Sequence, residues 1–373
     1  MTFSIKAISD IEEFSKMAIL WDCFARKHTE DPYVLHEFLY TYMQLKYSPT
    51  WDPLFFVGYD GKEIVGIAPL MMRKQLGARI ANSLQRRSES FIVDDCFRAK
   101  FIDYLLDLLF RTFRCKTANL SFQTGTSDLS SLEKSCAVKR IFFAATQCMG
   151  RRILATEGSW AQFESLKGSN FRNRFRKMEK KLSRSGPCRV TVAECQDDNA
   201  ILGKILNIDK ASWKEEGRTN EKMTDQDLLI TYKAAELAAR NVAGFKNKAW
   251  ILELNDLPIA FALVFQNGKT AVIAKTSYDV RFKNFYPGMY VINAVIRDLF
   301  NDKTVSNIDF VTDLPFMEAW TPHFRDRREI FLGKGFLVKR MLSLYLNEQA
   351  RSKVRAILNT TMGKSLTGSI HGF

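Results

Sequence analysis

The sequence has little histidine and no recurring cysteine pattern. Its 373 residues include 4 histidines and 7 cysteines. The cysteines are scattered, odd in number and never spaced as CxxC, so neither a disulfide framework nor a zinc site is indicated. The histidines are too dispersed to indicate a metal centre or a histidine-based proton relay. Metal catalysis is therefore disfavoured, and no metal ligand is predicted.

The sequence also lacks segments typical of export or membrane insertion. No basic, apolar, small-residue signal opens it, and the strongest apolar helix, at 101–113, is too short and too charged to span a bilayer. With 46% apolar and 26% charged residues, the composition is typical of a globular protein, and the length allows two domains. We therefore expect a cytoplasmic protein.

Basic residues are in excess. The chain has 55 Lys and Arg against 41 Asp and Glu, a formal charge of +14. A surplus of this size favours polyanionic or phosphate-bearing partners. Nucleic acid, an anionic lipid surface, a nucleotide-activated sugar and coenzyme A would all be attracted, so charge predicts a class of partner and no reaction.

An internal repeat is the main structural prediction. Residues 54–72 form two β-rich runs joined at Asp60-Gly61, a strong hairpin pattern. At an offset of 195 residues this segment overlays 250–265 without a gap, so that Phe55 falls on Trp250. In both copies a variable segment, an apolar helix and a strand follow. The repeat predicts two homologous domains.

We predict a mixed α/β (α+β) fold of two tandem domains, each a mostly antiparallel twisted sheet flanked by helices. The predicted boundaries are 1–155 for the first domain and 156–346 for the second, with a basic tail over 347–373.

The segment 278–310 carries the predicted ligand site. A strand ends near Ser277, a basic loop follows, and an apolar helix begins near Met289. Unpaired N–H groups at a helix start beside Arg281 and Lys283 form an anion site suited to a phosphate. Gly288 lets the backbone approach a ligand closely.

A strongly basic helix is predicted between the two copies. Residues 172–184 contain seven basic side chains and one acid, while Phe171, Phe175, Met178 and Leu182 form an apolar seam. Its cationic remainder fits a solvated face, a phosphorylated acceptor, an anionic membrane surface or nucleic acid. The abundance of Arg favours phosphate over a merely solvated face.

These motifs together resemble the GNAT superfamily of acyltransferases. The resemblance rests on the basic helix 169–182, the hairpin end PIAFALVF at 258–265, the stretch TSYDVRFKNFYPGM at 276–289, and the pair Asp309-Phe310 followed by Trp320. More narrowly, the motifs resemble the cellulose-biosynthesis-type acetyltransferases. In that family two GNAT domains lie in tandem, as they do in the Fem-type peptidyltransferases.

The resemblance implies transfer from acetyl-CoA or another acyl-CoA, without metal, to an amine or hydroxyl of a small or envelope-polysaccharide-related acceptor. The residues it assigns fall into three groups. The catalytic group is Asp309 as base or orienting carboxylate, Tyr278 as a donor to the departing thiolate, and Glu318. The cofactor-binding group is Arg281, Lys283, Tyr286, Gly288 and Met289. The substrate-binding group is Arg172, Arg176, Trp213 and Trp320.

The chain departs from the family pattern after Asp309. Where that pattern has Gly, Tyr and Lys, the chain has Asp313, Phe316 and Met317. The missing lysine indicates a different acceptor, a substitute such as Arg325, or lost activity. Two alternatives therefore stay open. One is a Fem-like transferase that uses aminoacyl-tRNA, and the other is a non-catalytic protein that binds RNA or an anionic membrane surface.

Overall fold

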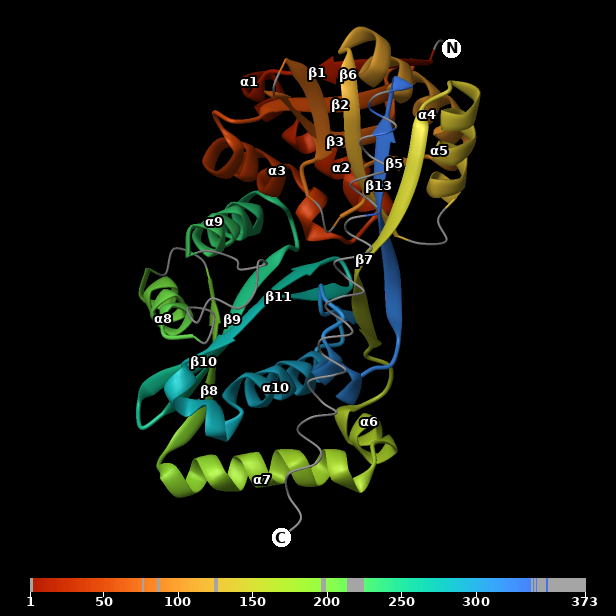
Figure 1. The fold of residues 1–373 in the computed structure, drawn as a ribbon. Coiled ribbons are helices and arrows are strands. Elements are labelled where there is room, and N and C mark those ends of the chain that lie inside the picture. Colours follow the sequence, from red (N-terminus) through yellow and green to blue (C-terminus); the bar gives the residue numbers. More distant parts are fainter. Residues whose placement is uncertain are drawn as a thin grey trace.

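One continuous, twisted sheet organises the molecule, with helices on both of its faces (Figure 1). The computed structural model describes residues 3–75, 77–85, 88–123, 127–195, 199–212 and 225–336, together with 338, 340 and 347. Within these residues the strand order is β1-β2-β3-β4-β6-β13-β7-β12-β11-β10-β9-β8, with β5 beside β3. Most neighbours are antiparallel, which confirms the predicted mixed α/β class.

The first half of the chain supplies the upper part of the sheet in Figure 1. Its elements are β1 (Phe3–Ile8), α1 (Ile11–Ser15), α2 (Ala18–His28), η1 (Pro32–Val34), α3 (His36–Tyr42), η2 (Met43–Tyr47), β2 (Asp52–Asp60), β3 (Glu63–Gln75), β4 (Ala78–Ser83), β5 (Ile92–Val93), η3 (Asp95–Phe97), α4 (Arg98–Asp107), η4 (Leu108–Thr112), β6 (Cys115–Gln123), α5 (Ser127–Val138) and β7 (Phe142–Ala155).

The second half supplies the lower part in Figure 1, apart from its last strand, β13, which lies in the upper part. Its elements are α6 (Trp160–Leu166), α7 (Ser169–Ser185), β8 (Cys188–Glu194), α8 (Asn199–Lys210), α9 (Asp225–Asn241), β9 (Lys246–Leu254), β10 (Leu257–Asn267), β11 (Thr270–Tyr278), η6 (Val280–Phe285), α10 (Pro287–Asn301), β12 (Asn307–Asp309), η7 (Pro315–Ala319) and β13 (Phe324–Gly333). No helix in the described part of the chain is long and apolar enough to cross a membrane.

The two halves repeat one topology. In the first half, the hairpin β2-β3 and strand β4 lead through α4 to β6, which pairs with β4 in parallel. In the second half, the hairpin β9-β10 and strand β11 lead through α10 to β12, which pairs with β11 in parallel. These matching parallel pairs, each joined by a crossover helix, make the fold a tandem one.

The structure corrects the offset between the copies from 195 to 194 residues. The two-residue turn at Gly61 matches the turn at Asn255, and both hairpins keep this offset along their ladders. Phe55 then corresponds to Ala249, and both face the core beneath α3 and α9, whereas Trp250 packs on the opposite face against α10. A one-residue slip moves every side chain to the other face of a sheet, which is why the offset of 195 was wrong.

The last strands of the two halves are exchanged. β13, from the end of the chain, lies between β6 and β7 in the sheet of the first half. The end of β7 in turn pairs with β12 of the second half, from Ile153 to Ala155. The division at 155/156 stays a prediction, but residues 324–333 belong to the sheet of the first half. The predicted tail, 347–373, lies outside the described residues apart from position 347.

Candidate functional site

Strands β11 and β12 separate next to the predicted ligand loop. They pair in parallel only from Thr270 to Val272, opposite 307–309, and the rest of β11 runs on without this neighbour. On the other side of β11, the register with β10 shifts between Leu263 and Val264, which leaves Ala274 as an extra residue. Such bulges bend a strand and are common next to active sites. The sheet therefore opens toward the end of β11, where the loop begins.

The loop from Asp279 to Pro287 turns the chain into α10. The Asp279 carboxylate accepts a hydrogen bond from the Arg281 N–H at 2.9 Å, which starts η6. Tyr286 is left-handed, with φ of 53°, and Pro287 occupies the first turn of α10. Because the first N–H groups of a helix have no intrahelical acceptor, those of Gly288 and Met289 are available to an anion.

Gly288 lies against the ring of Tyr278. A Cβ atom placed on Gly288 would come within 3.1 Å of Tyr278 Cδ1, so the end of β11 and the start of α10 are in close contact. The structure therefore brings together Tyr278, Tyr286, Gly288 and Met289, four of the residues assigned from the sequence.

The two cations of the loop differ in their surroundings. Arg281 Nε donates to both carboxylate oxygens of Asp279, each at 3.0 Å. These hydrogen bonds lower the pKa of Asp279. The Arg281 side chain is still 69% exposed. Lys283 is also exposed, whereas Lys181 of α7 donates to the Asn284 carbonyl at 2.9 Å and so holds the basic helix against the loop.

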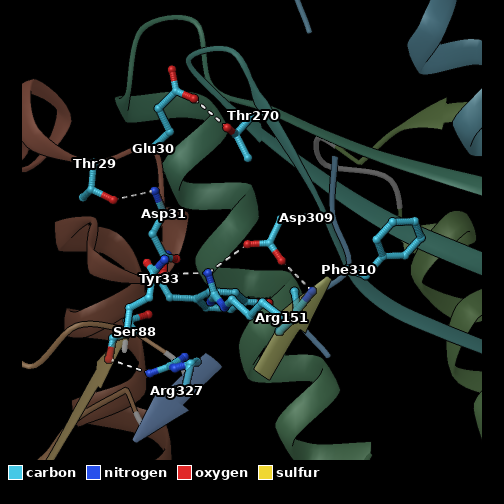
Figure 2. Close-up of polar contacts among 12 residues, drawn as sticks. Thr29, Glu30, Asp31, Tyr33, Ser88, Arg151, Thr270, Asp309, Phe310 and Arg327 are labelled. Atoms are coloured by element: carbon cyan, nitrogen blue, oxygen red, sulfur yellow. Dashed lines mark hydrogen bonds and ion pairs between the residues drawn. The ribbon is translucent and has the colours of Figure 1, made fainter. Parts of the chain in front are cut away.

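A buried charge cluster joins the two halves where β7 meets β12 (Figure 2). Arg151 Nη1 lies 2.9 Å from Asp309 Oδ2 and 3.1 Å from Asp31 Oδ2. Asp31 precedes η1 in the first half, and Asp309 ends β12 in the second. Arg151 Nε and Nη2 are buried and have no hydrogen-bond acceptor within the described residues.

Both oxygens of Asp309 are occupied in this cluster. Oδ2 accepts from Arg151, and Oδ1 accepts from the Val311 N–H at 2.6 Å. Burial raises the pKa of Asp309, and the positive charge of Arg151 opposes that rise. Protein groups therefore engage both oxygens of Asp309, and its role as base or orienting carboxylate stays a prediction.

The structure does not bring Asp309 next to the ligand loop. Asp309 pairs with Val272, and Tyr278 lies six positions further along β11, roughly 20 Å away at about 3.3 Å per residue. Glu318 forms an ion pair with Arg152 at 2.8 Å. Arg151 and Arg152 are consecutive on β7 and point to opposite faces of the sheet, so Asp309, Glu318 and Tyr278 lie in three separate places.

The predicted substrate-binding residues also lie apart. Trp320 is 1% exposed and packs in the core beneath α10, with Nε1 3.2 Å from Asn293 Oδ1. Arg172 donates to three carbonyls at the end of α6, the nearest being that of Lys167 at 2.6 Å. Arg176 is exposed on α7, and Trp213 lies outside the described residues.

Reasoning from the sequence missed Arg151 and Asp31. The signal for the first was two consecutive arginines, 151 and 152, ahead of the apolar run Ile153-Leu154-Ala155. Burial of both arginines on one strand demands nearby acids. No pattern in the sequence indicates that one of these acids lies 120 residues earlier, in the loop before η1.

Comparisons with known proteins agree with this architecture. Residues 169–317, from the start of α7 to η7, match the family model described as the acetyltransferase (GNAT) domain. FemX shares the fold with a TM-score of 0.59 and 11% identity, covering 88% of this chain and 97% of that one. No curated protein matches the sequence.

Two further structures share the fold. One is the C-terminal domain of a putative lysylphosphatidylglycerol synthetase from Agrobacterium fabrum, with a TM-score of 0.55 and 13% identity over 90% of this chain and 95% of that one. The other is L-PGS from Bacillus licheniformis, with a TM-score of 0.53 and 11% identity over 92% and 97%.

The family match and the shared fold define a class. Residues 169–317 form a GNAT-type domain, and the chain as a whole has a tandem GNAT-like fold. At these identities the solved structures establish the fold alone. The narrower resemblance to the cellulose-biosynthesis-type acetyltransferases stays a prediction.

Proposed function

We propose that this protein is an acyl-CoA-dependent N- or O-acyltransferase that binds its donor where β11 leaves β12 and α10 begins. The observation that supports this most is the separation of two parallel strands beside a helix start with available N–H groups. All of these elements lie within the GNAT-matched residues. We also propose that 156–346 is the donor-binding domain and that 1–155 lines the acceptor side.

Each loop residue has a role in this proposal. The N–H groups of Gly288 and Met289 bind the pyrophosphate of the acyl-CoA, and Lys283 and Arg281 balance its charge. Tyr286, which is 60% exposed, contacts the ligand from the edge of the loop. The cytoplasmic location expected from the sequence suits a donor of this kind.

The reaction needs no cofactor beyond its donor. The acceptor nitrogen or oxygen attacks the thioester carbonyl, the new C–N or C–O bond forms, and the C–S bond breaks. The acceptor proton passes to solvent water. The thiolate of coenzyme A takes a proton from the Tyr278 hydroxyl, the proposed donor, and Tyr278 regains a proton from solvent. Asp309 and Glu318, held by Arg151 and Arg152, are proposed to orient a part of the acceptor that lies away from the reacting thioester.

An aminoacyl donor is the second candidate. The fold is shared by a domain of a putative lysylphosphatidylglycerol synthetase, whose name states that a lysyl group is attached to phosphatidylglycerol. An aminoacyl ester is an activated acyl group like a thioester, and the same loop could hold its phosphates. The acceptor we propose is a small molecule or a glycan precursor for an acyl-CoA donor.

Calorimetric titration of the full chain with acetyl-CoA tests the proposal. We expect binding by the wild type and a loss of about tenfold in affinity, or 1.4 kcal/mol, for Gly288→Ala, because the added Cβ crowds Tyr278 and the phosphate site. Gly168→Ala, where a Cβ meets nothing within 4 Å, is the matched control and should bind normally. A folded protein that binds no acetyl-CoA but binds aminoacyl-tRNA would replace the first candidate with the second.

A further inference from the structure

Helix α7 carries a row of unpaired cations on its outer face. Phe171, Phe175, Met178 and Leu182 are buried and attach the helix to the second half. At 100° per residue, Arg176, Lys180 and Arg184 point directly away from this seam. These three side chains are exposed and form no ion pair within the described residues. Lys177, beside them, is also exposed and also forms no ion pair there.

This arrangement is unfavourable for an isolated helix surface. Arg176 and Lys180, and Lys180 and Arg184, are like-charge pairs at spacing i,i+4, each of which costs a few tenths of a kcal/mol. The acid on α7, Glu179, points to the flank and leaves the outer row uncompensated. The three charges span roughly 12 Å along a straight helix. An external anionic surface would remove the repulsion.

Exposed apolar side chains lie at both ends of α7 and beside it. Leu166, at the corner between α6 and α7, is 87% exposed. Leu257 is 44% exposed and follows the turn at Asn255, whose side chain donates to the Ser185 carbonyl at the end of α7. Tyr286 follows Phe285, whose ring lies 5.4 Å from Lys181 Nζ.

Among the described residues, helix α7 lies across one end of the structure (Figure 1). In Figure 1 it runs across the bottom, with α6 at one end and the loop before α10 above it. A straight, outward cationic helix with leucines at its ends matches a flat anionic layer into which apolar side chains can enter. Nucleic-acid bases stack on aromatic side chains, which leucine cannot replace, so leucines at the ends of the helix fit nucleic acid less well than lipid.

We propose that the α7 face, meaning Arg176, Lys177, Lys180 and Arg184 with Leu166 and Leu257, docks on an anionic lipid surface. The cations contact lipid phosphates, and the leucines enter the boundary between headgroups and acyl chains. Because Lys181 ties α7 to the loop before α10, docking brings the start of α10 close to the membrane. This inference does not depend on which acyl donor the protein uses.

Vesicle co-sedimentation of the full chain tests the docking. We expect binding to phosphatidylcholine vesicles that contain phosphatidylglycerol and little binding to phosphatidylcholine alone, with the bound fraction falling as salt rises. Each basic residue near such a surface contributes about 1 kcal/mol, so the variant Arg176→Glu/Lys180→Glu/Arg184→Glu should bind at least about a hundredfold more weakly.

A matched variant separates a local face from net charge. Lys62→Glu/Lys116→Glu/Lys134→Glu makes the same charge change at exposed sites of the first half and should lose much less affinity. Equal losses in the two triple variants, or no preference for phosphatidylglycerol, would overturn the proposal. Unchanged far-UV circular dichroism of each variant shows that it folds.

Leu166→Ser separates a membrane from a soluble polyanion. If the face docks on lipid, this variant binds vesicles several-fold more weakly, while any binding to single-stranded RNA is unchanged. If the wild type prefers RNA over the vesicles and Leu166→Ser leaves vesicle binding intact, the partner is nucleic acid and the lipid proposal is wrong.

Discussion

Arg151 is the residue through which the two halves share a charge. Its guanidinium lies between Asp31 of the first half and Asp309 of the second, with all three largely buried. A buried ion pair adds little over an apolar replacement, but loss of one partner leaves an uncompensated charge and is strongly destabilising. Arg151 therefore stabilises the fold mainly by compensating the charges of two carboxylates that burial has already removed from water.

Replacing Arg151 with Met should destabilise the protein in a pH-dependent way. Arg151 lowers the pKa of Asp309, which burial raises, so its removal raises that pKa further. A carboxyl whose folded-state pKa is raised contributes stability at low pH that is lost as pH rises through the folded value. We expect Arg151→Met to cost about 3–5 kcal/mol at neutral pH and less near pH 4, measured by urea unfolding at both pH values.

The control for this variant is an exposed ion pair. Arg111→Met breaks the contact with Asp107 at spacing i,i+4, where the Arg111 side chain is 69% exposed. Such pairs contribute less than about 1 kcal/mol. Equal costs for the two variants, or a cost for Arg151→Met that does not change with pH, would mean that Asp309 is not held by Arg151.

Sequence reasoning reached some residues of the site and not others. Pro287-Gly288 and the basic side chains before them indicate a helix start with an anion site, because that chemistry is local. Arg151, Asp31 and Asp309 meet only through long-range pairing, which no local pattern encodes. Trp320 is assigned to the substrate through the family resemblance, and the structure places its side chain in the core.

At the scale of single elements, hairpin β2-β3 depends on two glycines. Gly58 and Gly66 face each other across the ladder, and the ring of Phe101 from α4 covers both. A Cβ on Gly66 would lie 2.6 Å from Phe101 Cδ2. The helix can therefore pack this closely only while both positions lack a side chain.

The variant Gly66→Ala should lose about 1–3 kcal/mol of folding free energy, since Phe101 is fully buried and cannot move aside without strain. Gly203→Ala in α8, where a Cβ meets nothing within 4 Å, should instead gain roughly 1 kcal/mol from helix propensity. Thermal unfolding of both variants measures the two effects. A stabilised Gly66→Ala would mean that the contact with Phe101 is looser than described.

The repeat was visible in the sequence, but its register was not. Alternating apolar residues in both hairpins indicate the copies, yet both faces of this sheet are covered by helices, so Phe55 and Phe56 are equally buried. The hydrophobic pattern then cannot tell one face from the other. Only the contacts with α3 and α4 show that Phe56, rather than Phe55, corresponds to Trp250.

For the whole molecule, the exchange of β7 and β13 makes the halves depend on each other. Asn119 of β6 and Glu329 of β13, 210 residues apart in the chain, are hydrogen bonded at 2.7 Å. A chain that ends at residue 155 leaves β6 and β7 without the strand between them. A single boundary at 155/156 therefore separates β13, residues 324–333, from the sheet to which it belongs.

We expect the full chain to unfold in urea as one cooperative unit, with coincident transitions by far-UV circular dichroism and tryptophan fluorescence. A fragment of residues 1–155 should show no cooperative transition, because β6 lacks its partner from Arg327 to Gly333. Adding residues 320–336 to that fragment through a flexible linker is the matched control and should restore cooperativity. Two separate transitions in the full chain would show that the halves are independent.

The exchanged strand also has a consequence during synthesis on the ribosome. The first half cannot complete its sheet until residues 324–333 have emerged from the ribosome. Strand β6 therefore keeps an open edge while about 200 further residues are made. At about 5–20 residues per second, this delay is roughly 10–40 s. An open edge of this kind invites pairing with other chains. A nascent chain of this protein is therefore expected to bind chaperones that shield strand edges until translation is complete.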